Sequence, residues 1–414
     1  MLPTNPRFRI NSTVGLYFKL LSNLIPEGRD QGTLNILEQK LSEKFNKEYC
    51  IFVPQARVGI YLAIKSLIRN NKKEIVLSPY TIADVVNMVI CAGAIPVFAD
   101  ISRNSCNITP ESVRKRLTPN TAAVMITHLH GIPADPVDFQ NLCDSKGLPL
   151  VEDAAQAFGA KLCNKAVGSF GKIGIFSFGR YKNITSFYGG AVLTDDKEIT
   201  ESIRKEISSY SPMPKRKLLK RGLDCLIKDL LTAPGIYHFF TYQLVKAAKR
   251  KKLNIILKHI EAELDLSLKN EFPDSYKDFP LSVQAEMVLS KLDSVDSDTK
   301  VRISNAKIYH QHLSHLHNLI TPSLATDGSS IYTCYPVQYE FRDELVTRLL
   351  DFGCDIGVQH IKNCADLPAF QAFYRDCPNA RATANETIML PTYPAFGGKN
   401  IERTAQAVRK IIRS

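Results

Sequence analysis

The sequence of 414 residues has no tryptophan and no apolar run long enough for a simple membrane-spanning helix. Its longest uncharged apolar stretch, residues 230–245, covers sixteen residues and is interrupted by Pro234 and Gly235. The N-terminus lacks the apolar core and small-residue cleavage site of a signal peptide. We therefore expect neither a membrane-spanning nor a secreted protein. With 44% hydrophobic residues, the composition predicts a globular chain of about two or three domains.

Cysteine and histidine spacing excludes two further classes of site. The ten cysteines lie between Cys50 and Cys377 without a C-x-x-C pair, and the closest two, Cys354 and Cys364, lack zinc spacing. A disulfide framework or a zinc ribbon is therefore not expected. His128 and His130 could lie on one face of a strand, but no third ligand accompanies them at metal spacing. We expect reduced cysteines, a cytoplasmic protein and no metal site.

Positive charge is concentrated in one part of the chain. The formal net charge is +12, and residues 204–258 contain fourteen lysines and arginines against three acidic residues. The remainder of the chain is therefore close to neutral. A basic segment can attract nucleic acid or an anionic membrane. Aromatic residues are not interleaved with the basic ones as in single-strand binders, so we expect no nucleic-acid binding.

Helix-like and strand-like patterns alternate before the basic segment. Predicted strands cover residues 50–53, 75–77, 96–99, 122–127 and 149–152, and predicted helices cover residues 58–68, 83–91 and 136–145. This alternation predicts an α/β fold with a mostly parallel central sheet, whose ligands bind at the carboxyl ends of the strands. A buried helix at 281–292 and a second set of elements (332–339, 344–352 and 401–412) predict a smaller C-terminal α/β domain.

We divide the chain accordingly into four parts. The large domain is expected over residues 1–212, and a basic amphipathic insertion over 213–268. Residues 269–298 are expected to form a helix that completes the large domain, and 299–414 the small C-terminal domain.

The most informative region is residues 151–194. The phosphate-binding patterns of P-loop and dinucleotide-binding proteins are absent from the chain. Asp153 follows an apolar strand, and Lys182 lies in a polar loop after the strand-like residues 173–178. Singly, a strand-end aspartate is more often a helix cap and a loop lysine a solvated charge. Together they suit pyridoxal phosphate, because a lysine can form a Schiff base and a carboxylate can keep the pyridine nitrogen protonated. A hydroxyl such as Ser177 can bind the phosphate.

The motifs in this region resemble the DegT/StrS family of sugar aminotransferases, which are fold-type I pyridoxal phosphate enzymes. The resemblance rests on E-D-A-A-Q-A from Glu152, V-G-S-F-G-K-I from Val167, and S-F followed by K-N-I-T from Lys182. Further similar segments are A-G-A-I-P-V-F-A-D at 92–100, N-I-T-P-E at 107–111, H-L-H-G-I-P-A-D at 128–135 and L-P-T-Y-P at 390–394. The resemblance covers most of the chain outside the basic segment.

The resemblance implies a role for each matching residue. Lys182 is expected to hold the cofactor and move the proton, and a lysine rather than a histidine there favours transamination over dehydration. Asp153 is expected at the pyridine nitrogen, Gln156 near the ring hydroxyl and Ser177 at the phosphate. The implied substrates are a nucleotide-linked keto-sugar and glutamate, used in glycan biosynthesis, and the implied assembly is a homodimer.

Several positions depart from the family pattern. Ala56 and Arg57 replace a Gly-Thr pair in the early phosphate turn, and Arg57 either binds the phosphate or points away. Ile82 stands where the family often has an aromatic that stacks on the cofactor. Tyr188 replaces an acid near the substrate, and we also expect substrate contacts from His128 and His360. An alternative is therefore a catalytically weak relative with a binding or regulatory role.

The basic segment is longer than the corresponding connection in the family. Its apolar residues 223–245 are flanked by basic clusters at 215–221 and 249–252. Such a pattern suits the headgroup region of an anionic bilayer. It equally suits a helical hairpin that packs on the protein body or on a second subunit. We therefore expect residues 213–258 to contact either the inner face of the membrane or other protein surfaces.

Overall fold

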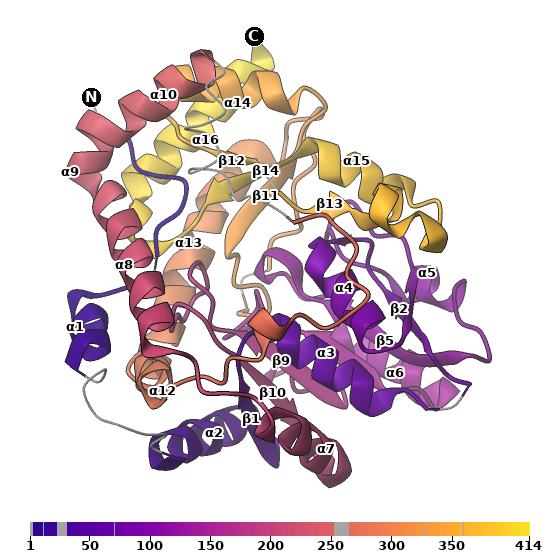
Figure 1. Cartoon of the computed structure of the whole chain (residues 1–414). Helices are drawn as coiled ribbons and strands as arrows, with labels where there is room; N and C mark the ends of the chain where they lie inside the picture. The colour runs from indigo at the N-terminus through magenta and orange to yellow at the C-terminus, as the bar shows by residue number, and fades with distance from the viewer. Residues whose placement is uncertain are drawn as a thin grey trace.

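A computed structural model of the chain describes residues 3–10, 12–22, 31–69, 71–251, 265–325, 327–358 and 360–414. Its central sheet has the strand order β1 (Tyr49–Val53), β10 (Gly190–Thr194), β9 (Ile173–Ser177), β6 (Leu150–Asp153), β5 (Thr121–Thr127), β2 (Glu74–Leu77) and β4 (Ile95–Phe98). Strand β10 is antiparallel to both neighbours, and the pairs from β9 to β4 are parallel. The predicted α/β fold with a mostly parallel sheet is confirmed (Figure 1).

Helices cover the sheet because its strands are apolar on both sides. Every residue of β5 and β6 is buried, as parallel strands between two helical layers require. Helix α3 (Ala56–Leu67) contacts α4 (Ala83–Cys91) and α7 (Lys197–Ser208). Helix α2 (Gln31–Phe45) contacts α12 (Ser282–Leu289), and α5 (Pro110–Arg114) contacts α6 (Pro136–Lys146). The predicted helix at 83–91 has the bounds of α4, and the others agree to within a few residues.

The C-terminal elements form a second unit with its own core. Strands β11 (Cys334–Gln338), β14 (Thr387–Pro391) and β12 (Gly357–Val358) make an antiparallel sheet. Helices α13 (Val295–Leu313), α14 (Arg342–Asp351) and α16 (Gly398–Arg413) pack on one another beside it, and α15 (Pro378–Glu386) precedes β14. Their buried side chains form a hydrophobic cluster separate from that of the central sheet.

The first described residues contact this C-terminal unit, although the prediction assigns them to the large domain. Arg7 donates from Nε to Asp355 Oδ1 at 2.9 Å, and Asn5 donates to the carbonyl of Phe396 at 2.8 Å. The ion pair between Arg7 and Asp355 holds these residues on the C-terminal unit, and a local sequence pattern does not predict such a distant contact. The other domain boundaries remain predictions.

The described part of the basic segment, up to residue 251, folds as helices along one edge of the molecule (Figure 1), and residues 252–264 of the predicted insertion lie outside the described residues. The helices are α8 (Lys215–Leu231), α9 (Pro234–Ile236), the π-helical turn η2 (Tyr237–Thr241) and α10 (Tyr242–Arg250). Helix α8 contacts α1 (Val14–Ser22), and α10 is tied to the end of α14 by Arg250 and Asp351 at 2.6 Å. One side of the segment thus packs on its own chain. Among the helices of the described residues, none is both long and apolar enough to cross a bilayer.

Candidate active site

Three of the predicted site residues lie at the carboxyl ends of neighbouring parallel strands. His128 follows β5, Asp153 ends β6 and Ser177 ends β9. The register pairs Thr127 with Asp153 and Asp153 with Ile175. The strand pairing therefore brings these three positions to one edge of the sheet, where an open α/β fold binds its ligands.

Asp153 is a buried carboxylate at this edge. Its residue is 4% exposed, and Oδ1 accepts the N–H of Ala155 at 3.1 Å. Burial raises the pKa of Asp153, while the Ala155 hydrogen bond and the charge of Lys182 act in the opposite direction. A buried carboxylate of this kind is stabilised by a cationic partner.

Lys182 lies in the loop between β9 and β10. Two backbone hydrogen bonds close the loop, from Phe178 N to Gly189 O at 2.9 Å and from Ser186 N to Phe178 O at 3.0 Å. The side chain of Lys182 is half-buried. Burial lowers its pKa, Asp153 opposes the shift, and the positive charge of Arg57 adds to it. A lowered pKa increases the fraction of neutral amine, which is the nucleophilic form.

The N-terminus of α3 lies beside Ser177. Gly190 pairs with Val53 on one side and with Ser177 on the other. A Cβ on Gly190 would lie 2.6 Å from the backbone nitrogen of Ala56, so only glycine permits this approach. The helix-capping residue Gln55 gives no side-chain hydrogen bond to the first turn. Free N–H groups at this helix end and the Ser177 hydroxyl suit a phosphate group.

Arg57 is anchored next to this helix end. Its guanidinium forms an ion pair with Asp84 and lies 3.2 Å from the hydroxyl of Tyr276. Lys269 also pairs with Asp84, at 2.6 Å. The structure therefore ties Arg57 to α4, while its charge still acts on Lys182. A direct contact between Arg57 and a phosphate remains a proposal.

Gln156, Ile82 and His360, which are also predicted site residues, belong to different elements. Gln156 accepts the backbone N–H of His130 at 2.9 Å. Ile82 is the half-buried residue before α4. Strand β3 (Tyr80–Thr81) pairs with β13 (Lys362–Asn363), which brings the segment around His360 to the large domain. The side chain of His360 is exposed, and desolvation together with the charges of Lys182 and Lys362 lowers its pKa.

His128 has a different role from the one expected. Its side chain is fully buried, Nε2 lies 3.1 Å from Glu152 Oε2, and Nδ1 accepts the N–H of Ala134 at 3.2 Å. Glu152 also accepts the N–H groups of Gly168 and Gly171. Because both ring nitrogens are engaged, His128 has none left for a substrate. The prediction of a substrate contact is corrected to a structural one.

Sequence reasoning assigned no role at the site to two residues near it, although it considered His130 as a metal ligand. His130 is fully buried with φ 59°, and burial lowers its pKa to about 4. Its Nε2 has no hydrogen-bond partner among the described residues. Arg221 of α8 lies over the ring of Tyr188, with the guanidinium carbon 3.7 Å from the ring centroid. The H-L-H motif could have drawn attention to His130. Arg221 gives no sequence signal, because it is one of many cations in the basic segment.

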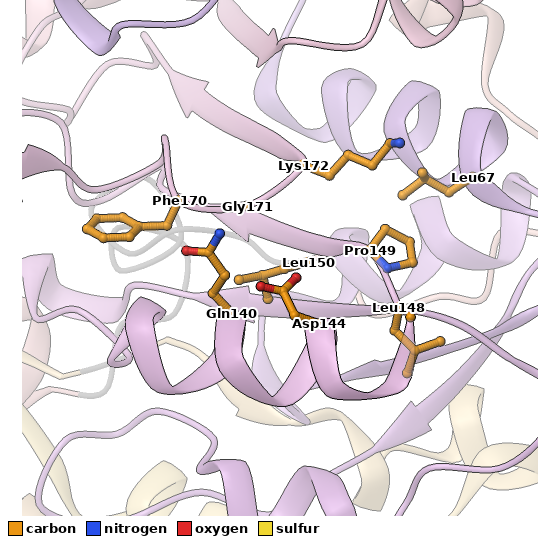
Figure 2. A pocket seen from close by; sticks show the side chains of 10 residues that line it. Leu67, Gln140, Asp144, Leu148, Pro149, Leu150, Phe170, Gly171 and Lys172 are labelled. Atoms are coloured by element: carbon orange, nitrogen blue, oxygen red, sulfur yellow. The ribbon is translucent and has the colours of Figure 1, made fainter.

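A cavity of about 430 Å³ lies at the opposite end of the strands (Figure 2). Its lining comes from the residues that precede β6 and β9, including Pro149, Gly171 and Lys172, and from Asp144 near the end of α6. The figure shows these side chains around the amino ends of the two strands. None of the predicted site residues lines this cavity.

The residues at the carboxyl ends fit pyridoxal phosphate. Lys182 supplies an amine with lowered pKa, and Asp153 supplies a buried carboxylate suited to a pyridinium. Gln156 and Ile82 are proposed to border the ring, and Ser177, Ala56 and Arg57 to hold the phosphate. The assignment of each residue to its cofactor atom is a proposal.

Comparison with known proteins shows which proteins this chain is similar to. Spore coat polysaccharide biosynthesis protein SpsC of Bacillus subtilis is 27% identical over 390 residues, with 90% of this chain and 89% of that protein covered. GDP-perosamine synthase of Vibrio cholerae is 34% identical over 164 residues, covering 40% of this chain and 45% of that protein. The solved structure of Helicobacter pylori PseC, an aminotransferase of pseudoaminic acid biosynthesis, covers 99% of both chains with a TM-score of 0.76 at 20% identity.

A family model matches residues 28–268 and 281–409, which is most of the chain. The matching description is the DegT/DnrJ/EryC1/StrS aminotransferase family. A structure of NtdA from Bacillus subtilis with the cofactor PMP bound has the same fold, with a TM-score of 0.75 at 19% identity over 100% of this chain and 86% of that chain. The chain belongs to the DegT/DnrJ/EryC1/StrS aminotransferase family and is a pyridoxal-phosphate-dependent aminotransferase of fold type I.

Proposed function

We propose that the enzyme transfers an amino group from glutamate to a nucleotide-linked keto-sugar, in the biosynthesis of a polysaccharide or other glycan. The observation that carries this proposal is the position of Lys182 beside the buried Asp153, at the carboxyl ends of adjacent strands. The names of SpsC and GDP-perosamine synthase support the choice of sugar substrate.

Each residue has a defined task in this proposal. Pyridoxal phosphate, when bound, supplies an aldehyde and an electron sink. Lys182 holds the aldehyde carbon through Nζ and moves a proton between substrate and cofactor with the same atom. Asp153 keeps a proton on the pyridine nitrogen through its carboxylate. The N-terminus of α3, Ser177 and Arg57 hold the phosphate, so that the reacting carbon stays within reach of Lys182.

The reaction can be followed by the absorbance of the bound cofactor. Purified protein with added pyridoxal phosphate should show the visible absorbance of the lysine-bound form. Glutamate alone should remove this absorbance, and the correct keto-sugar from a panel of UDP-, GDP- and dTDP-linked compounds should restore it. If no amino donor changes the absorbance, the proposal is contradicted and the binding or regulatory alternative is favoured.

The proposal includes a homodimer and a location at the inner face of the cytoplasmic membrane. The outward side of the basic segment bears large exposed apolar side chains, which we call the α8–α10 face: Leu219, Leu223, Ile227, Leu230, Leu231, Ile236, Phe239, Phe240 and Leu244. Val14, Phe18 and Leu21 of α1 are exposed as well. The five residues on α8 recur at helical spacing on one side of the helix.

An anionic lipid surface is the occupant that we propose for the α8–α10 face. Residues 215–251 contain ten lysines and arginines and two aspartates. Two copies packed symmetrically through this face would bring like charges together, whereas anionic headgroups neutralise them. Lys215, Arg216, Lys220, Arg250 and Lys251 are exposed. Apolar side chains beside exposed cations suit the headgroup and acyl boundary.

Vesicle co-sedimentation tests this location. Vesicles that contain phosphatidylglycerol should bind the protein at low salt and release part of it at high salt, and neutral vesicles should bind it less. The double variant Phe239→Glu/Phe240→Glu should lose binding. Ile95→Glu, at the far edge strand β4, is the matched control, since Ile95 is also exposed. A double variant that changes the oligomeric state instead would show that a second copy covers this face.

A further inference from the structure

The inner side of the basic segment reaches the active site. Arg221 lies on α8 with its guanidinium carbon 3.7 Å from the ring centroid of Tyr188. Arg180, in the same loop as Lys182, has its guanidinium carbon 5.8 Å from the same centroid. Tyr188 is held in place because its carbonyl accepts from Gln284 Nε2 at 2.6 Å and from Ser186 Oγ at 2.7 Å. Two guanidinium groups therefore meet at one fixed ring in the lysine loop.

Arg221 differs from Arg180 and Arg57 because it forms no ion pair with a carboxylate of the described residues. Arg180 forms an ion pair with Asp224, and Arg57 pairs with Asp84. The hydrogen bond found for Arg221 goes to Met213 Sδ at 3.7 Å, and within the described residues no carboxylate forms an ion pair with it. Arg221 is half-buried. A partly desolvated guanidinium without a counter-ion is costly unless an anion neutralises it.

The electrostatic environment agrees with this geometry. Burial lowers the pKa of Arg221, and the positive charges of Arg180 and Arg57 add to the shift against Tyr188 and Asp278. Arg57 also acts on Lys182. Arg180 and Arg57 therefore act on Arg221, and a guanidinium that pairs with no carboxylate of the described residues favours an anionic ligand.

The chemistry of that anion follows from the donors. A guanidinium presents planar paired N–H groups that match two oxygens of a phosphoryl group. Stacking on Tyr188 holds the plane of Arg221 and leaves its edge for hydrogen bonds. In the proposed function, the cofactor phosphate binds at the N-terminus of α3. A second phosphoryl group enters the proposed reaction only with the nucleotide-linked sugar.

We propose that Arg221, on its Tyr188 platform and beside Arg180, binds the diphosphate of the nucleotide-linked sugar. This inference rests on the proposed function. It makes the basic segment a specificity element with two sides, one that binds the substrate's diphosphate and one that faces outward. Arg221 acts as a substrate-binding residue and takes no part in proton transfer.

The two half-reactions of an aminotransferase separate this role from others. Arg221→Ala should leave the glutamate half-reaction unchanged, because glutamate carries no phosphoryl group. The KM for the nucleotide-linked keto-sugar should rise about ten- to a hundredfold, as expected for loss of hydrogen bonds to a charged group. The maximal rate of the sugar half-reaction should change much less.

A binding measurement does not depend on the reaction. UDP, GDP and dTDP are titrated into the cofactor-loaded enzyme by calorimetry, with inorganic pyrophosphate as a base-free probe. Arg221→Ala should weaken the tightest of these ligands by the same factor. Arg221→Lys keeps the charge but loses the planar fork, so it should retain part of the affinity. Arg216→Ala, exposed on the same helix, is the matched control and should have no effect on binding.

The results of these measurements distinguish the proposed role of Arg221 from other roles. Unchanged diphosphate affinity in a folded Arg221→Ala variant overturns the inference, as does a wild-type enzyme that binds none of these ligands. A loss confined to the glutamate half-reaction assigns Arg221 to the donor carboxylate, and a loss of cofactor affinity assigns it to the cofactor phosphate. Both results also overturn it. Failure of the wild type with every amino donor would instead contradict the proposed function, because diphosphate binding is measured separately.

Discussion

The two ends of the strands in the central sheet carry different kinds of residue. The amino ends border the cavity of about 430 Å³, but the charged residues there make ordinary surface contacts, such as Lys172 with Asp196 at 2.8 Å. The carboxyl ends place Asp153 and Lys182 in surroundings that shift both pKa values. Buried charged residues with shifted pKa values are therefore a better guide to the proposed active site than the volume of a cavity.

The largest expected effect comes from replacing, one at a time, the lysine at each end of the strands by alanine. Lys182→Ala should abolish the visible absorbance of bound pyridoxal phosphate and all transamination, because it removes the amine that is proposed to hold the aldehyde. Lys172→Ala, at the amino end, should leave both unchanged. Absorbance spectra and the glutamate half-reaction check this pair. Full activity in Lys182→Ala would refute the assignment of the carboxyl end.

A smaller effect is expected from the aspartates. Asp153→Asn should slow the glutamate half-reaction by about ten- to a hundredfold, because a hydrogen bond between charged groups is worth about 1.5–3 kcal/mol. Asp144→Asn, which borders the cavity, is the matched control. Stopped-flow measurement of the cofactor absorbance gives both rates. Equal rates for wild type and Asp153→Asn would leave the pyridine nitrogen without its proposed partner.

Substitution of the buried Glu152 should change the stability of the fold without changing the activity of the folded enzyme. Its carboxylate accepts from Gly168 and Gly171 near the amino ends and contacts His128 at the carboxyl end. Glu152→Gln should lower the free energy of unfolding by about 1–3 kcal/mol, the usual cost of leaving buried polar groups unsatisfied. Denaturant unfolding of the cofactor-free protein measures this. The exposed Glu111→Gln should have no measurable effect, and activity per folded molecule should persist in both.

The smallest effect is a shift in pH dependence. Lys182 must be neutral to capture the aldehyde, and it is neutral above its lowered pKa. Removing the positive charge in Arg57→Ala raises this pKa, so the pH of half-maximal cofactor capture should move up. Lys65→Ala, farther along α3 and paired with Glu206, is the control. A downward shift would contradict the electrostatic account, whatever the change in affinity.

Local patterns were sufficient for most of the fold. The strand and helix positions follow from runs of apolar residues and from turn residues between them, and α4 has the bounds that were predicted. The assignments that failed or were missing depend on contacts between distant residues. His128 seemed available because its sequence gives no sign of the buried Glu152 beside it, and residues 3–10 find their partners almost at the other end of the chain.

The sequence by itself determined the family and the cofactor and predicted the residues that carry the chemistry, because these depend on side-chain types in a short loop after a strand. Lys182 and Asp153 could be recognised in this way. Only the tertiary structure decided that Arg221 lies over Tyr188 and that α8 has a packed side and an exposed apolar side. The order of residues shows that Arg221 is basic, but packing of α8 against α1 and the lysine loop decides which cations face the site and which apolar residues face outward.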